Sequence, residues 1–169
     1  YTKPRSGSYV ADISIDDMLK IAFMRSALEG VAAYYACLNL MQDDFSRMHA
    51  ILDSVSALLA GPAPDPEIIH QQNVAFHDVI RSAAGSSYLT NQIQTLRTID
   101  YSFRQVAQME YIEEPIPAHR EHLQILAALE ARQPERSEQL MTAHIRRVAL
   151  FVANRAKALR SMTKDENNT

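Results

Sequence analysis

Four side chains on three predicted helices could bind a metal ion together. Asn73 and His77 lie four residues apart, so on a helix they project from one face about one turn apart. His122 and His144 lie on two later predicted helices, each among apolar residues. If these helices face a shared interior, three imidazole nitrogens and the amide oxygen of Asn73 would be available to a cation. Zinc, nickel, copper and iron all accept imidazole, so the residue types do not name the metal.

The same histidines also admit a purely structural interpretation. A histidine on a partly apolar helix face is commonly a hydrogen-bonded residue of the core or its boundary. His49 and His70 are expected to be solvated or boundary residues, because neither belongs to a ligand pattern. His119 lies one turn from His122 and could support it as a neighbouring side chain, but we expect His119 to be exposed at the end of a loop. Spacing alone leaves both interpretations of the histidines open.

The elements that must position these residues are helices. Apolar residues recur at steps of three and four, which is typical of amphipathic helices. Ser14 with Asp17 resembles a capping box, and Asp65 with Pro66 can begin a later helix that Gly85 ends. The chain has only 4 glycines and 7 prolines, few for a β protein. An all-α antiparallel bundle of six or seven helices is predicted, with helices over about 14–40, 43–60, 66–84, 87–110, 117–131 and 134–162.

Composition narrows the function classes. A chain of 169 residues is expected to be one domain with at most a fragment of a second, and its 17 basic and 20 acidic residues argue against binding nucleic acid by bulk charge. With 47% apolar and 22% charged residues the chain is globular and not disordered. Cys37 is the single cysteine, which excludes an internal disulfide and fits a cytoplasmic location. No apolar run approaches 18 residues, so no membrane span is predicted.

Four short motifs, in order along the chain, resemble those of one family. Arg25–Glu29 reads R-x-x-L-E, and Asn73–His77 resembles D-x-x-F-H. Glu121 with His122 resembles an E-H motif, and His144 with the following isoleucine resembles H-[LI]. In these motifs, over about residues 14–150, the chain is similar to the C-terminal FCD domain of GntR-family transcription regulators.

A further motif near the start of the chain suggests a domain organisation. Residues 7–10 read Gly-Ser-Tyr-Val and resemble the last wing strand of a winged helix-turn-helix domain. Residues 1–13 are therefore expected to be a wing remnant and linker, 14–162 the all-helical domain, and 163–169 a polar tail. The chain does not begin with methionine, so a segment is expected upstream that would carry the rest of the DNA-binding domain.

The resemblance implies a domain that binds a divalent metal, senses a small carboxylic acid and forms homodimers beside a DNA-binding domain. The implied metal ligands are Asn73, His77, His122 and His144, with zinc or nickel as the expected ion. The family more often has aspartate at position 73, so asparagine should weaken the site and leave the full charge of the ion to attract an anion. Ser86 is a second departure, because the family commonly has asparagine there.

Two arginines are candidates for binding the effector, since the family tends to carry basic residues at Arg25 and Arg97. The alternatives are a helix-surface pair between Arg25 and Glu29, and a solvated Arg97. A regulatory domain is predicted, and not an enzyme. A di-iron bundle would need two Glu-x-x-His pairs, and only Glu67–His70 is present. Two alternatives remain. One is a metal-free bundle that binds an acyl or apolar ligand. The other is a mononuclear metalloenzyme, but its general base would have to be Glu121, which on a helix points about 100° away from the neighbouring His122.

Overall fold

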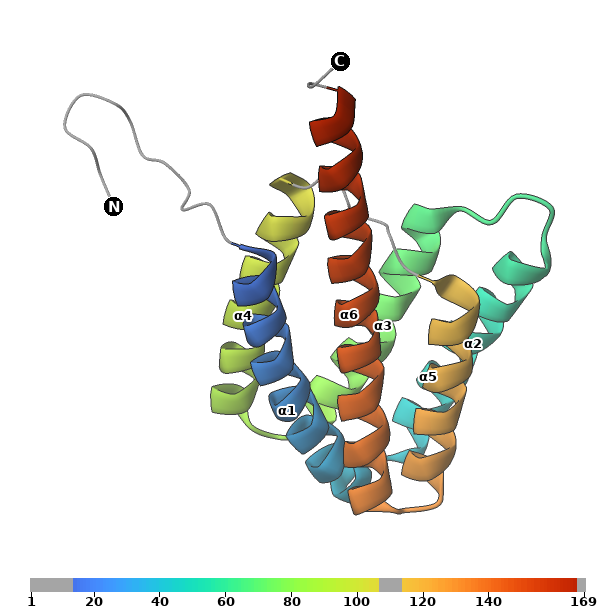
Figure 1. Cartoon of the computed structure of the whole chain (residues 1–169). Coiled ribbons are helices and arrows are strands. Elements are labelled where there is room, and N and C mark those ends of the chain that lie inside the picture. The colour runs from blue at the N-terminus through green and yellow to red at the C-terminus, as the bar shows by residue number, and fades with distance from the viewer. Residues whose placement is uncertain (1–13, 107–113, 167–169) are drawn as a thin grey trace, which may run out of the picture.

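Most of the described backbone is helical. The computed structural model describes residues 14–106 and 114–166, and these contain six α-helices and no strand (Figure 1). The prediction of an all-α bundle is confirmed, whereas the expected wing strand and the expected end of the fourth helix near Glu110 lie outside the described residues. The helices are α1 (Ile15–Asn39), α2 (Gln42–Ala60), α3 (Pro66–Ala83), α4 (Ser87–Val106), α5 (Pro115–Glu130) and α6 (Pro134–Glu166).

Local sequence signals set several helix ends. The Ser14 hydroxyl accepts a hydrogen bond from the Asp17 amide at 3.0 Å and so caps α1. The Asp65 carboxylate caps α3, whose first residue is Pro66, where the missing amide hydrogen costs no helical hydrogen bond. Gly85 follows α3 with a φ of 71°, the left-handed conformation in which glycine commonly ends helices.

Two helix boundaries differ from the sequence-based expectation. α5 begins at Pro115 and not at Pro117, because a proline at the first helical position is as acceptable there as two residues later. α6 continues past Met162 to Glu166, so residues 163–166 belong to the helix and not to a tail. No glycine or proline follows Met162, so the sequence carries no signal that would stop the helix there.

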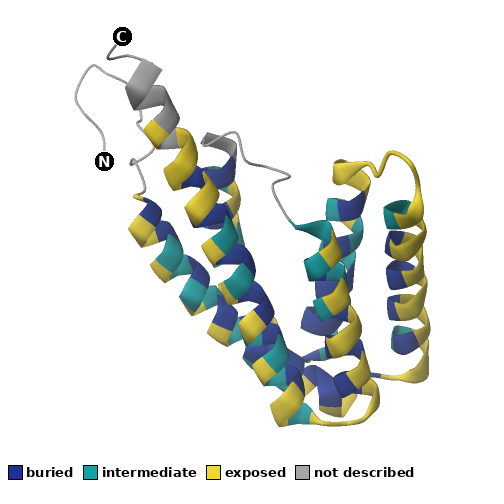
Figure 2. Cartoon of the chain, turned by 45° about the vertical axis from the view of Figure 1, so that its right-hand side comes forward, coloured by how far each residue is buried: buried dark blue, intermediate teal, exposed yellow. Residues whose placement is uncertain are grey.

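The helices pack in two groups, and contacts of α3 with α1 and of α5 with α6 join them. α1 and α6 run antiparallel and side by side, and α4 packs on the other side of α1 (Figure 1). α2, α3 and α5 form the second group, with α5 against α6 and α3 against α1. Buried residues line the inner faces of both groups, while the outward faces are exposed (Figure 2). The centre of the molecule is therefore bounded by α1, α3, α4, α5 and α6.

Two large clusters of buried apolar residues join the helices. The larger one joins α1, α2, α3, α5 and α6, with Phe76 and Met141 fully buried in it. The smaller one joins the first half of α1 to the second half of α6, with Phe103 of α4. Among the described helices, none is both long and apolar enough to cross a membrane.

Candidate metal centre

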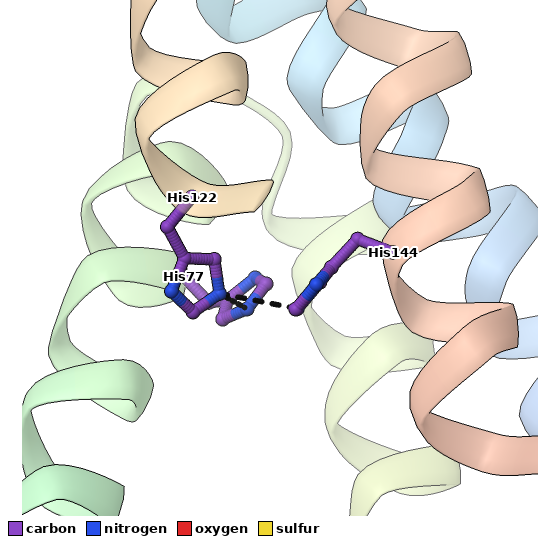
Figure 3. A group of neighbouring side chains, drawn as sticks. All are labelled: His77, His122 and His144. Carbon is purple, nitrogen blue, oxygen red and sulfur yellow. Dashed lines mark hydrogen bonds between the residues drawn. The ribbon is translucent and has the colours of Figure 1, made fainter. Parts of the chain in front are cut away.

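Three imidazoles from three different helices meet in the interior. His77 lies on α3, His122 on α5 and His144 on α6, and all three side chains are buried (Figure 3). The Nε2 atom of His122 lies 3.2 Å from Nε2 of His77 and 3.1 Å from Nε2 of His144. All three ligand atoms lie within 4.8 Å of one another. The fold thus brings together the three histidines that the sequence singled out.

His77, His122 and His144 are called the triad below, and Asn73 lies on α3 together with His77. It lies one turn before His77, its residue is 7% exposed, and its side chain lines the same cavity as the three imidazoles. The fourth residue of the expected ligand set therefore lies on the wall of the same cavity as the other three.

Burial keeps two of the imidazoles neutral. It lowers the pKa of His77 and of His122 well below the ordinary value, and the neighbouring imidazoles lower both further. His144 is fixed differently, because its Nδ1 lies 2.7 Å from Oε2 of Glu121. A carboxylate only accepts hydrogen bonds, so Nδ1 of His144 carries a proton, and in the neutral ring Nε2 would then offer its lone pair to a metal ion.

The three facing nitrogens are better arranged to bind a metal ion than to form hydrogen bonds with one another. Nε2 of His122 carries either a proton or a lone pair, so it can form only one good hydrogen bond although it faces two nitrogens. The buried Nδ1 atoms of His77 and His122 have no hydrogen-bond partner in the described part of the chain. Three neutral nitrogens and one amide oxygen form a donor set that fits zinc, nickel, copper or iron.

The centre lies on the wall of a cavity of about 240 Å³, which residues of α1, α3, α4, α5 and α6 line. Beyond the imidazoles its wall is strongly charged. The ionised side chains in the wall are four arginines and two carboxylates: Arg25, Arg81, Arg97, Arg104, Glu29 and Asp100.

Arg25 lines this cavity, and it does not form the surface pair with Glu29 that was considered as the alternative. Its Nη2 donates to Oδ2 of Asp100 at 3.3 Å, whereas Glu29 pairs with Arg81. Arg25 and Glu29 do lie four residues apart on α1, but that face of the helix points inward, where partners from α3 and α4 are closer. The Nε of Arg25 is buried and has no hydrogen-bond partner among the described residues.

Arg97 also lines the cavity and is not simply solvated. Its side chain is 22% exposed, and its Nη1 lies 3.2 Å from Oε1 of Gln94 and 3.5 Å from Oδ1 of Asp78. Burial lowers the pKa of Arg97, and the nearby Arg81 lowers it further. Arg97 is therefore held among charged neighbours at the cavity wall.

The other histidines differ in their surroundings. His70 is half-buried and lines the cavity, a role that the sequence-based interpretation missed although His70, Asn73 and His77 follow a helical spacing of three and four. His119 was expected to be exposed at a loop end, but α5 begins four residues earlier and His119 is half-buried with its Nε2 2.8 Å from Oγ of Ser56. His49 is exposed, as expected, and pairs with Glu130 on α5.

Glu121 was missed as a site residue, because its role depends on a helix that follows it in the chain. It cannot share the direction of His122, and it instead contacts His144 and Nε of Arg147 from α6. Burial raises the pKa of Glu121, but the hydrogen bonds from His144 and Arg147 outweigh this, so the pKa lies below its usual value. Glu121 is therefore an ionised carboxylate directly behind one imidazole of the triad.

Comparison with known proteins agrees with this architecture. The FCD domain model matches residues 20–147. The chain is 28% identical over 148 residues to a protein named uncharacterized HTH-type transcriptional regulator BphR, from Paraburkholderia xenovorans. It is 23% identical over 147 residues to the HTH-type transcriptional repressor RspR of Escherichia coli. These alignments cover 85% and 87% of this chain but only 60% and 63% of the two relatives.

The chain thus spans less than two thirds of the length of these relatives, and the matched part is the helical domain. Both relatives are named as transcriptional regulators, which agrees with the prediction of a regulatory domain and not an enzyme. The matched family covers most of the chain, including all three histidines of the centre. The chain therefore belongs to the FCD domain family, the C-terminal effector-sensing domain of GntR-family transcription regulators.

Proposed function

We propose that this chain is the sensing domain of a DNA-binding regulator and binds a divalent metal ion together with a small carboxylic acid. His77, His122, His144 and Asn73 would hold the metal, with zinc or nickel as the expected ion. The observation that carries the proposal is the convergence of three buried imidazole nitrogens at the end of a charged cavity. When bound, the ion would supply a Lewis-acidic position for a carboxylate oxygen.

The charges of the wall favour an anionic ligand. Four arginines and two carboxylates face the cavity, and all four proposed metal ligands are neutral. Arg25 and Arg97 are the proposed effector-binding residues, since guanidinium groups form charge-assisted hydrogen bonds with carboxylates. An acyl or apolar ligand in a metal-free bundle is less well supported, because it would desolvate these charged groups without offering them partners.

The position of the cavity suggests how binding would be transmitted. The proposed metal ligands come from α3, α5 and α6, whereas Arg25 and Arg97 come from α1 and α4. A ligand that contacts both sets of helices would favour one relative arrangement of them, which is a shift between existing states. In a homodimeric cytoplasmic regulator with an N-terminal DNA-binding domain, that shift would alter the relative placement of the two DNA-binding domains.

Removal of two imidazoles tests the proposal directly. The double variant His77→Ala with His144→Ala should lose bound zinc or nickel in elemental analysis while its circular dichroism remains helical. It should also lose the thermal stabilisation that a panel of small mono- and dicarboxylic acids gives to the unchanged protein. The variant His49→Ala removes an exposed histidine that pairs with Glu130 and lines no part of the cavity, and it should behave like the unchanged protein. Metal retained at full stoichiometry in the first variant would refute the ligand assignment.

A further inference from the structure

Each imidazole of the triad has a second nitrogen that points away from the centre, and these outer nitrogens differ. Nδ1 of His144 lies 2.7 Å from Oε2 of Glu121. The Nδ1 atoms of His77 and His122 are buried and have no hydrogen-bond partner in the described ranges. Of the three rings, His144 is the one whose outer nitrogen contacts a protein group that the structure describes.

Glu121 is itself held in place from α6. Its Oε1 accepts a hydrogen bond from Nε of Arg147, and Nη1 of Arg147 also donates to Oε2 of Glu114 at 2.7 Å. His144 and Arg147 lie three residues apart on α6, so both project from the same face and contact the same carboxylate. Both oxygens of Glu121 are therefore engaged, and the carboxylate cannot rotate away from His144 without breaking a charge-assisted bond.

We propose that Glu121 is the positioning residue of this centre: it holds His144 as the Nδ1–H tautomer, with its Nε2 lone pair facing His77 and His122. An imidazole whose outer N–H donates to a carboxylate is also a more basic ligand. α5 then supplies His122 as a ligand and, from the preceding residue, fixes the ligand of α6. The expected effect on metal affinity rests on the proposed function, whereas the tautomer of His144 is a property of the metal-free protein.

The substitution Glu121→Gln tests this with little change of shape. A glutamine amide can accept from Nδ1–H or donate to an unprotonated Nδ1, so it no longer imposes one tautomer. In the metal-free protein, ¹⁵N NMR should show His144 as the Nδ1–H form in the unchanged chain and as a mixture in the variant. The zinc Kd should rise by about 10- to 100-fold, the range typical for loss of such outer partners.

Glu130→Gln is the matched control. Glu130 also lies on α5 and also pairs with a histidine, His49, at 2.7 Å, but that pair is exposed and Glu130 lies about two helical turns beyond His122. It should leave the zinc Kd and the His144 tautomer unchanged. Glu121→Asp separates charge from position, because it keeps the carboxylate but shortens the side chain, and it should lose the single tautomer and weaken zinc binding as glutamine does.

The outcomes separate this inference from the proposed function. If the unchanged protein binds no zinc, the proposed metal site fails, and the tautomer of His144 in the two Glu121 variants still decides the inference. If His144 remains Nδ1–H in Glu121→Gln, with an unchanged zinc Kd, then Glu121 has no positioning role. If Glu121→Asp matches the unchanged protein while Glu121→Gln does not, charge and not position is responsible, and the inference is overturned.

Discussion

Glu29 of α1 and Arg81 of α3 form an ion pair whose two side chains are almost completely buried, at 1% and 5% exposure. Nη1 of Arg81 lies 2.9 Å from Oε1 and 3.2 Å from Oε2 of the Glu29 carboxylate. The same arginine also reaches Asp78, whose side chain is 50% exposed. The pair lines the cavity and links the helix that carries His77 to the helix that carries Arg25.

This arrangement predicts an asymmetry between the two partners. Arg81→Met removes the hydrogen-bond partner of a buried carboxylate and should lower the free energy of unfolding by about 3–5 kcal/mol. Glu29→Gln should lower it by less, because Arg81 keeps Asp78. The two variants are compared by urea unfolding at pH 7. Equal losses would mean that Asp78 contributes nothing to holding Arg81.

The buried imidazoles predict a loss of stability in mild acid. Burial lowers the pKa of His77 and His122 in the folded protein, whereas in the unfolded chain these groups titrate near their ordinary value. Below that value the unfolded chain binds more protons, so the free energy of unfolding decreases as the pH falls. The slope should reach up to about 1.4 kcal/mol per pH unit for each histidine and vanish above about pH 7.

Urea unfolding between about pH 7.5 and pH 5.5, in the presence of a metal chelator, measures this slope. His77→Gln and His122→Gln should each reduce it, because each removes one group that is neutral when folded and protonated when unfolded. His49→Gln is the control, since His49 is exposed. An identical slope in all four proteins would show that the buried rings do not titrate on unfolding.

Helix ends were predictable where a short-range contact sets them. The caps at Ser14 and Asp65 and the glycine at position 85 act on residues within three positions, so the sequence contains the whole interaction. The end of α6 was not predictable in this way, because nothing near Met162 stops a helix. The meeting of the three histidines was anticipated from apolar surroundings and family resemblance, and His70 could have been added from its spacing.

The contacts around the centre depend on how each helix is rotated, and sequence patterns do not contain that information. Arg25 and Asp100 are 75 residues apart, and Glu29 and Arg81 are 52 apart. A spacing of four on α1 suggested instead that Arg25 and Glu29 pair with each other. Glu121 shows the same effect. In sequence it is next to His122, but in the fold its carboxylate contacts His144 of α6.

At Gly30, α1 and α6 approach each other closely. A Cβ at this position would clash with Oγ1 of Thr142 and lie 3.2 Å from the carbonyl oxygen of Glu138. Gly30→Ala should therefore destabilise the protein by about 1–3 kcal/mol, because overpacking outweighs the better helix propensity of alanine. Gly30→Ala in a Thr142→Ala background should cost less, since the side-chain clash is gone. A double-mutant cycle by chemical denaturation measures the difference, and strict additivity would contradict the clash.

Asn73 offers a test of the fourth proposed ligand that changes charge and almost nothing else. Asn73→Asp places a carboxylate on the cavity wall one turn before His77. If this residue contacts the ion, the zinc Kd should fall by about tenfold or more, because a buried carboxylate attracts a divalent cation more strongly than a neutral amide does. A tenfold fall in Kd corresponds to about 1.4 kcal/mol of binding free energy. Without metal the same carboxylate is buried at a cost, so the variant should unfold more easily in chelator and gain more stability from added zinc.

The added charge should act against the effector. A ligand set that includes aspartate reduces the positive charge of the loaded centre, so carboxylic acids that stabilise the zinc-loaded protein should stabilise the Asn73→Asp variant less. Asn91→Asp is the control, because Asn91 is exposed on α4 and outside the cavity. Titration calorimetry with zinc, followed by thermal shifts with the acid panel, measures both effects. Unchanged zinc affinity in Asn73→Asp would place this side chain outside the coordination sphere and leave the three imidazoles as the whole protein contribution.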